Sequence, residues 1–177
     1  AARRTVEEER TAHSLHGYFI LPGDIGAPIV YFVDRLRDGK GFATRQVTAI
    51  QHGRAIFNMS ASFQVVEEDG MDHQLPMPDV PGPDSVMSEQ DLKRMVLEHG
   101  SGPVKAYWSR ERPIELGPVS LKHYMGSEAL EPVQYAWIRA NGTLPDDPAI
   151  HKCVLAYASD FLLLHTSLYP HGRSLFV

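Results

Sequence analysis

The sequence predicts an α+β protein in which antiparallel strands come first and a long helix follows. Two turn signals, RDGKG (37–41) and QHGR (51–54), separate runs rich in β-branched and aromatic residues. A capping serine precedes an amphipathic stretch at 88–99, and an apolar run occupies 153–164. We therefore expect the strands of one β-rich unit, followed by the opening of a second.

The composition is that of an ordinary globular chain of 177 residues, with 43% hydrophobic and 22% charged residues. Its 17 basic and 22 acidic residues give a net charge of −5, which provides no general attraction to nucleic acid or to anionic membranes. The single cysteine excludes an intrachain disulfide and suits a reducing compartment. No secretion signal is recognisable at the start. The apolar run is too short to span a membrane. Both ends of the sequence are expected to fall within structured regions.

Three or four antiparallel strands are expected in the first part of the chain. An apolar and aromatic run at 13–21 ends at the PGD turn (22–24), and the two hairpins follow it. In the last run two sets of residues alternate: Ile56, Asn58, Ser60 and Ser62 with Phe57, Met59, Ala61 and Phe63. This period of two predicts a meander with one face on a core and the other face in polar surroundings.

The middle of the chain is expected to be a connector and a capped helix. Four prolines make 67–87 an extended connector. Ser88 is the expected N-cap of a helix over 88–99, with Asp91 three residues later. A second loop is expected between this helix and the next strand.

The last third is expected to hold two strands, at 112–121 and 133–144, and one helix from about 148 to 168. Asp146 or Asp147 lies at the expected N-cap of that helix. The helix is apolar on nearly every side, which is typical of a helix buried against a sheet.

Asp160 interrupts this apolar helix. An ionised carboxylate is costly to bury without partners, so such a residue serves as a cap, as half of an ion pair, or in chemistry. Held by a few hydrogen-bond donors, it could orient and deprotonate a water molecule. A structural aspartate tied to the backbone or to an arginine is the alternative.

Other polar residues give weaker signals. His13 and His16 should point to opposite faces of a strand and so cannot chelate one metal ion; structural roles are the alternative. Five cations near the hairpins could meet phosphate groups or simply form a solvated face: Arg35, Arg37, Lys40, Arg45 and Arg54.

Several mechanisms lack a motif. No G-x-S-x-G elbow, P-loop or G-x-G-x-x-G is present, which leaves serine hydrolysis, nucleotide hydrolysis and dinucleotide binding unsupported. His165 lies five residues beyond Asp160, a poor spacing for a dyad on one helix face, and His151 and His171 lie farther away.

Four blocks closely resemble the acyl-CoA thioesterase II family: HSLHGYFILPGD, RLRDGKGFATRQVTAIQHGRAIFNMSASFQ, WIRANGTLPDDPAIHKCVLAYASDF and LYPHG. The resemblance implies a double hotdog, in which antiparallel sheets wrap round long central helices. It assigns 1–66 to strands of the first hotdog domain, 67–111 to a linker with a short helix, and 112–177 to the opening strands and central helix of the second domain. Both hotdogs would then be incomplete in this chain.

The resemblance also implies an activity, the hydrolysis of fatty acyl-CoA to free fatty acid and CoA. Asp160 occupies the family's catalytic position and would activate a water molecule, without a metal or other cofactor; the family's assisting hydroxyl and glutamine lie later in the chain. The residues that bind the substrate are not predicted. A cytoplasmic or peroxisomal homo-oligomer, joined through its hotdog sheets, is expected.

Two other functions stay open. A non-catalytic hotdog fragment could bind acyl-CoA or serve in assembly. A hotdog hydratase or dehydratase would instead require a histidine within hydrogen-bond reach of a carboxylate in a pocket.

Overall fold

The computed structural model describes residues 1–67, 70–125 and 127–173 and divides the chain into two compact units. Unit 1 is Ala1–Gln74 and unit 2 is Leu75–Val177.

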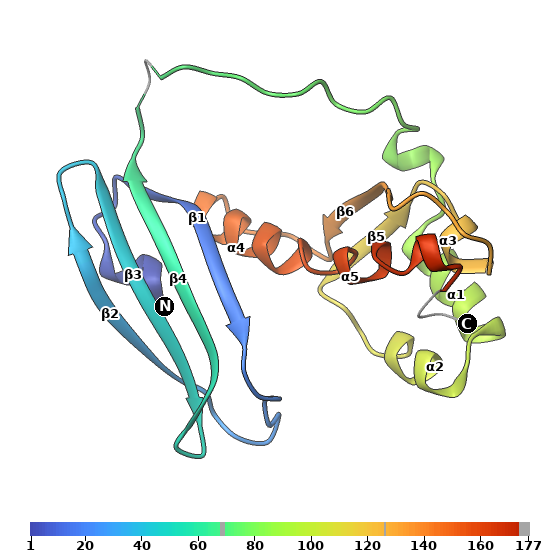
Figure 1. Cartoon of the computed structure of the whole chain (residues 1–177), viewed down its shortest axis with the longest axis horizontal. Coiled ribbons are helices and arrows are strands. Elements are labelled where there is room, and N and C mark those ends of the chain that lie inside the picture. Colours follow the sequence, from blue (N-terminus) through green and yellow to red (C-terminus); the bar gives the residue numbers. More distant parts are fainter. Residues whose placement is uncertain (68–69, 126, 174–177) are drawn as a thin grey trace. The chain divides into compact units, whose positions relative to one another are not determined.

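Unit 1 is built on one antiparallel sheet, as the sequence predicts. Its strands are β1 (Arg10–Phe19), β2 (Val30–Asp38), β3 (Phe42–Gln51) and β4 (Arg54–Val65). They lie in the order β1-β4-β3-β2, so that β2, β3 and β4 form the meander and β1 pairs with the other edge of β4 (Figure 1).

Both predicted hairpins are present. The turn between β3 and β4 places His52 at φ 49° and Gly53 at φ 73°. Two successive left-handed residues match the right-handed twist of the flanking strands, and histidine tolerates this conformation better than most side chains do. The β2–β3 turn is closed by a hydrogen bond of 2.8 Å from the Gly39 N–H to the Phe42 carbonyl.

The predicted alternation of faces is confirmed. Ala43, Val47, Ala61 and Phe63 are buried on one face of the sheet, where they pack with Ala2 of a short 3₁₀-helix, η1 (Ala2–Thr5). Burying a side chain of the size of phenylalanine contributes about 1.5–3 kcal/mol. The opposite face carries hydroxyl and amide groups.

Polar side chains pair across that second face. Thr48, Gln46 and Thr44 of β3 lie opposite Asn58, Ser60 and Ser62 of β4, respectively. The Asn58 amide donates to the Thr48 hydroxyl over 3.2 Å and accepts from the Gln46 amide. Cross-strand pairs of this kind fix the register of a sheet.

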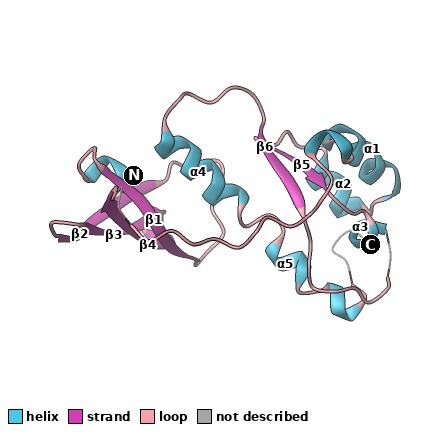
Figure 2. Ribbon diagram, turned by 90° about the horizontal axis from the view of Figure 1, so that it is seen from above, coloured by secondary structure: helices cyan, strands magenta, loops and turns pink. Residues whose placement is uncertain are grey.

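Unit 2 combines a two-stranded sheet with short helices (Figure 2). The strands β5 (Ile114–Pro118) and β6 (Ala136–Ala140) pair antiparallel, as expected, but are shorter than predicted. The helices are α1 (Glu89–His99), α2 (Gly102–Trp108), α3 (Lys122–Met125), α4 (Pro148–Ala158) and α5 (Leu163–Thr166), with 3₁₀ turns η2 (Pro83–Ser85) and η3 (Tyr169–His171).

The expected N-caps are confirmed. The Ser88 hydroxyl accepts from the Asp91 N–H over 3.1 Å at the start of α1, and the Asp147 carboxylate accepts from the Ala149 N–H over 2.8 Å at the start of α4. Each cap satisfies one N–H that lacks a partner within its helix and is worth about 1 kcal/mol.

The loop expected between α1 and β5 is wrong, because it contains α2. Pro103 lies in the first turn of this helix, where its missing N–H has no consequence, and the helix buries Trp108 almost completely. Trp108 packs with Leu92, Val96 and Tyr124 in the core of unit 2. Tertiary packing of Trp108 therefore stabilises a helix where the sequence predicts a loop.

Candidate active site

Asp160 lies two residues beyond the end of α4, not inside a helix. The predicted single helix from 148 to 168 is interrupted: α4 ends at Ala158, and α5 begins only at Leu163. The Asp160 side chain is exposed, which corrects the expected burial. Within the described part of the chain its carboxylate makes no ion pair or hydrogen bond, and neither a hydroxyl nor a glutamine contacts it.

The interruption has an identifiable geometry. The Ser159 hydroxyl donates to the Ala156 carbonyl over 2.8 Å, and the Phe161 N–H reaches the Ala158 carbonyl over 3.2 Å, three residues back. Serine side chains that bond to a preceding carbonyl bend helices, because they compete with the backbone ladder. No role is predicted for Ser159 from the sequence, although a hydroxyl next to a candidate catalytic carboxylate is a recognisable signal.

A small aromatic cavity of about 30 Å³ lies against this kink. Phe161 and Leu162, which directly follow Asp160, line it together with His165. Its other walls come from α2, α3, β5 and the segment that leads into β5: Tyr107, Trp108, Arg112, Leu116 and Tyr124. A volume of this size holds about one water molecule.

The charge on the cavity wall is compensated. The Arg112 guanidinium stacks over the Trp108 ring at 3.9 Å from its centroid and pairs with the Glu89 carboxylate. Glu89 also accepts the Leu116 N–H over 3.0 Å. Because both Glu89 oxygens accept hydrogen bonds and the Arg112 guanidinium is stacked on Trp108, this largely buried pair fixes α1 against β5 rather than offering a charge to a ligand.

Two tyrosines and a glutamine form a polar bridge in the same unit. The Tyr169 hydroxyl donates to the Gln134 carbonyl oxygen over 2.6 Å, and the Gln134 amide donates to the Tyr124 hydroxyl over 3.4 Å. Burial raises the pKa of Tyr124 to about 12 and also raises the pKa of Tyr169. Both phenols are therefore neutral near pH 7 and act as hydrogen-bonding groups.

The LYPHG block has a structural role next to this bridge. The Leu130 N–H donates to the Tyr169 carbonyl over 2.9 Å. Gly172 adopts φ 61°, and a Cβ at that position would lie 2.5 Å from the Ser127 carbonyl oxygen. Only glycine fits here, because the backbone is left-handed and a neighbouring chain segment passes close by.

The histidines near Asp160 do not form a dyad with it. Burial lowers the pKa of His165, whose ring lies on the cavity wall, and His151 Nε2 lies 3.1 Å from the Pro145 carbonyl oxygen. Histidine and carboxylate meet at exposed positions instead, such as His52 with Asp24. This arrangement gives no support to hydratase or dehydratase chemistry.

The His52–Asp24 pair predicts a measurable pH effect. His52 Nε2 lies 2.9 Å from the Asp24 carboxylate, which also accepts the Gly26 N–H over 2.8 Å; these contacts lower the pKa of Asp24, with His52 having the larger effect. The stabilisation is present above the unfolded-state pKa and is lost as the pH falls through the folded-state pKa. Carboxyl ¹³C titration should find a higher pKa for Asp24 in His52→Ala than in the unmodified chain. Equal Asp24 pKa values in His52→Ala and in the unmodified chain would show that His52 does not stabilise the Asp24 carboxylate.

The expectation that His13 and His16 face opposite ways is wrong. The pairing of β1 with β4 shifts register between Ala12 and Ser14, which forms a β-bulge at His13. His13 then hydrogen-bonds the Ser62 hydroxyl over 2.8 Å, while His16 lies opposite Ser60. Both rings are exposed on the polar face of the sheet. Residues three apart in a regular strand point to opposite faces, but the extra residue of the bulge brings His13 and His16 to the same face.

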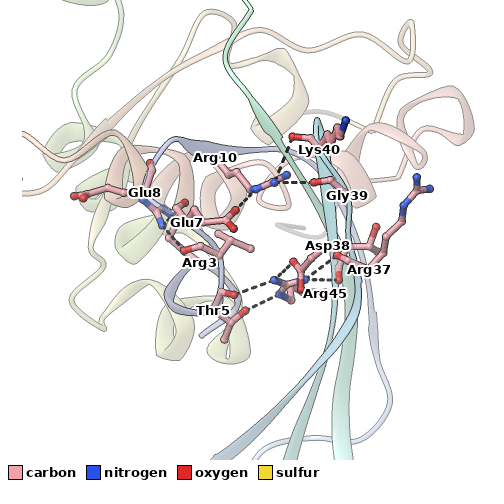
Figure 3. Close-up of polar contacts among 12 residues, drawn as sticks. Arg3, Thr5, Glu7, Glu8, Arg10, Arg37, Asp38, Gly39, Lys40 and Arg45 are labelled. Carbon is pink, nitrogen blue, oxygen red and sulfur yellow. Dashed lines mark hydrogen bonds and ion pairs between the residues drawn. The ribbon is translucent and has the colours of Figure 1, made fainter.

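Arg45 is also not where the sequence suggested. Four of the five basic residues near the hairpins are exposed, but Arg45 is only 1% exposed and lies on the core face of β3. Its guanidinium pairs with Asp38 and donates to the Thr5 hydroxyl over 2.8 Å and to the Thr5 carbonyl over 2.9 Å (Figure 3). A side chain engaged in this way holds η1 on the sheet and is not available to phosphate groups.

Within residues 1–67, 70–125 and 127–173, no three or more histidine, cysteine, aspartate or glutamate side chains are grouped so that they could hold a metal ion. Nor does any helix there have the length and apolar character needed to cross a membrane.

Known families match both parts of the chain. Residues 1–64 match the acyl-CoA thioesterase N-terminal domain, and residues 104–177 match the acyl-CoA thioesterase family. Acyl-CoA thioesterase 2 of Haemophilus influenzae is 39% identical over 173 residues, which are 98% of this chain and 60% of that protein. Acyl-coenzyme A thioesterase 8 of Mus musculus is also 39% identical, over 97% of this chain and 56% of that protein. The chain therefore spans little more than half the length of these relatives.

Solved structures show the same likeness. The acyl-CoA thioesterase II TesB2 of Mycobacterium marinum superposes with a TM-score of 0.71 at 37% identity, over 96% of this chain and 58% of that one. A protein with a hot dog fold from Alicyclobacillus acidocaldarius superposes with a TM-score of 0.66 at 19% identity, over 96% of this chain and 55% of that one. The fold is thus a hotdog fold, as the sequence implied.

Proposed function

The chain belongs to the acyl-CoA thioesterase II family, and from this premise we propose that it is part of an enzyme that hydrolyses fatty acyl-CoA to free fatty acid and CoA. The observation that carries the proposal is that the Asp160 carboxylate is accessible. This residue lies within the region matched by the thioesterase family, and its carboxylate is exposed and outside any ion pair among the described residues. It is therefore available to a water molecule and a substrate.

In the proposed reaction, Asp160 is a general base. Its carboxylate takes a proton from water as the water oxygen attacks the thioester carbonyl carbon. The carbon–sulfur bond then breaks, the fatty acid is released, and the CoA sulfur leaves as a thiolate or takes up the proton. Positioned general bases contribute about 10²–10⁴-fold in rate.

The acyl chain would lie along α4 and α5, the helices that flank Asp160. The apolar side chains of α4 and α5 are largely exposed, among them Leu155 at 68% and Tyr157 at 53%. Several exposed apolar side chains on neighbouring helices are typical of a surface that meets a hydrocarbon chain or another apolar segment. No side chain in the described part of the chain is assigned to the CoA phosphates.

The remaining features of the proposal follow from family membership. Residues 1–66 and 112–177 are assigned to a first and a second hotdog domain, joined by 67–111. The whole enzyme is a homo-oligomer of lipid metabolism, joined through its sheets and located in the cytoplasm, or in the peroxisome of a eukaryote. The relative from Saccharomyces cerevisiae, which is named a peroxisomal thioester hydrolase, supports the second location.

The release of free thiol from a long-chain acyl-CoA, followed with a thiol reagent, tests the proposal. Steady release that saturates with substrate is the expected result. Acyl-CoA binding by calorimetry without any release would overturn it and favour a non-catalytic hotdog fragment. Crotonyl-CoA serves as a second substrate, because addition of water to its double bond, without release of thiol, would indicate a hydratase.

A further inference from the structure

The turn that carries Asp160 is tighter than a helix. In a regular α-helix the Ala156 carbonyl would accept the Asp160 N–H, four residues on. Here the Ser159 hydroxyl donates to that carbonyl over 2.8 Å, and the next hydrogen bond, from the Phe161 N–H to the Ala158 carbonyl, spans three residues. This three-residue hydrogen bond follows the 3₁₀ pattern, in which the chain turns by about 120° per residue in place of about 100°.

Apolar contacts hold the same turn on its inner side. Ala158 is only 3% exposed, and Phe161 and Leu162 line the aromatic cavity. Leu163 and Leu164, by contrast, are 70% and 69% exposed. The turn is therefore fixed from within, while the Asp160 carboxylate is directed into solvent.

We propose that Ser159 is a positioning residue for Asp160. Its hydroxyl competes with the Asp160 N–H for the Ala156 carbonyl and so sets the direction of the carboxylate in the turn after α4. This inference rests on the proposed function, because it assigns Ser159 a role only if Asp160 is the base. It adds a residue whose own side chain does not touch the substrate.

The size of the expected effect follows from geometry. Without the hydroxyl, the Asp160 N–H can bond to the Ala156 carbonyl, and the turn relaxes toward an α-helix. A rotation of about 20° per residue moves a carboxylate by about 1 Å or more, and a misplacement of about 1 Å can lower a rate by about 10²-fold. We expect a loss of at least about tenfold in kcat.

The chain offers a matched control for Ser159→Ala. The Ser167 hydroxyl donates to the Leu164 carbonyl over 2.7 Å, the same bond three residues back, at the end of α5. Ser167→Ala therefore removes an equivalent hydrogen bond away from Asp160. Ser159→Thr retains a hydroxyl that can bond to the same carbonyl.

The experiment measures kcat, KM and thermal unfolding for the three variants, with thiol release as the assay. Ser159→Ala should lower kcat at least about tenfold, with KM within about twofold and no loss of thermal stability, because alanine favours the helix. Ser159→Thr should recover most of kcat, and Ser167→Ala should match the unmodified chain. Equal kcat values for Ser159→Ala and Ser167→Ala would overturn the assignment, as would a failure of threonine to restore the rate.

A structural measurement separates this inference from the proposed function. Backbone ¹³Cα shifts of 159–162 should move toward helical values in Ser159→Ala but not in Ser167→Ala. If these shifts do not move, the positioning inference fails even in an active enzyme. If they move while the unmodified chain releases no thiol, the hydroxyl controls the turn but the proposed function has failed, and the positioning role falls with it.

Discussion

Replacing Asp160 by asparagine is expected to lower kcat for acyl-CoA hydrolysis by about a hundredfold or more. The amide is nearly isosteric with the carboxylate but cannot accept a proton from water. Because the Asp160 side chain is exposed and outside any ion pair in the described ranges, the substitution should remove no contact that stabilises the fold. The unfolding free energy should stay within about 0.5 kcal/mol.

Asp146→Asn is the matched control for that variant. Asp146 is an exposed aspartate just before α4, at the other end of the helix from Asp160. Thiol release measured at saturating substrate should be unchanged in Asp146→Asn. Unchanged turnover in Asp160→Asn would remove Asp160 from the chemistry, whatever the activity of the chain.

Replacing Arg45 by alanine is expected to destabilise unit 1 by about 3 kcal/mol. The buried guanidinium donates to carbonyls of Thr5, Arg37 and Thr44 as well as to Asp38, so its removal leaves several acceptors without a donor and opens a cavity. Loss of a buried, fully paired charge costs about 3–5 kcal/mol, and the lower end applies because Asp38 is half exposed.

Urea denaturation followed by far-UV circular dichroism measures this effect. Fluorescence is unsuitable, because both tryptophans, Trp108 and Trp137, lie in unit 2. Arg35→Ala is the control, since Arg35 is the cross-strand neighbour of Arg45 but is exposed on the edge strand β2. A loss of stability no greater in Arg45→Ala than in Arg35→Ala would show that the buried network does not hold η1 on the sheet.

Much of the fold follows from local sequence. The hairpin over 51–54 is predictable because a left-handed pair with glycine second admits few other structures. The faces of β4 are predictable because its residues alternate with a period of two, and Ala61 and Phe63 are buried while Ser60 and Ser62 are not. Ser88 and Asp147 are predictable as caps because their oxygens reach N–H groups two or three residues away.

The errors arise where distant residues decide the structure. The bulge at His13 depends on register against β4, and the burial of Arg45 depends on the approach of η1; neither appears in the local pattern. The apolar pattern over 148–168 is helical throughout, but the Ser159 hydroxyl and the cavity around Phe161 interrupt the backbone. Asp160 is therefore singled out by its place in the apolar run and by resemblance, but its predicted burial is wrong.

A single turnover of a long-chain acyl-CoA in H₂¹⁸O tests the central claim most directly, namely that Asp160 activates water for thioester hydrolysis. The account predicts ¹⁸O in the carboxyl group of the released fatty acid in that first turnover, with no label in the peptide that carries Asp160. Label in Asp160 would show that the carboxylate itself attacks the thioester. The absence of any released CoA from an intact, folded chain would contradict hydrolysis altogether.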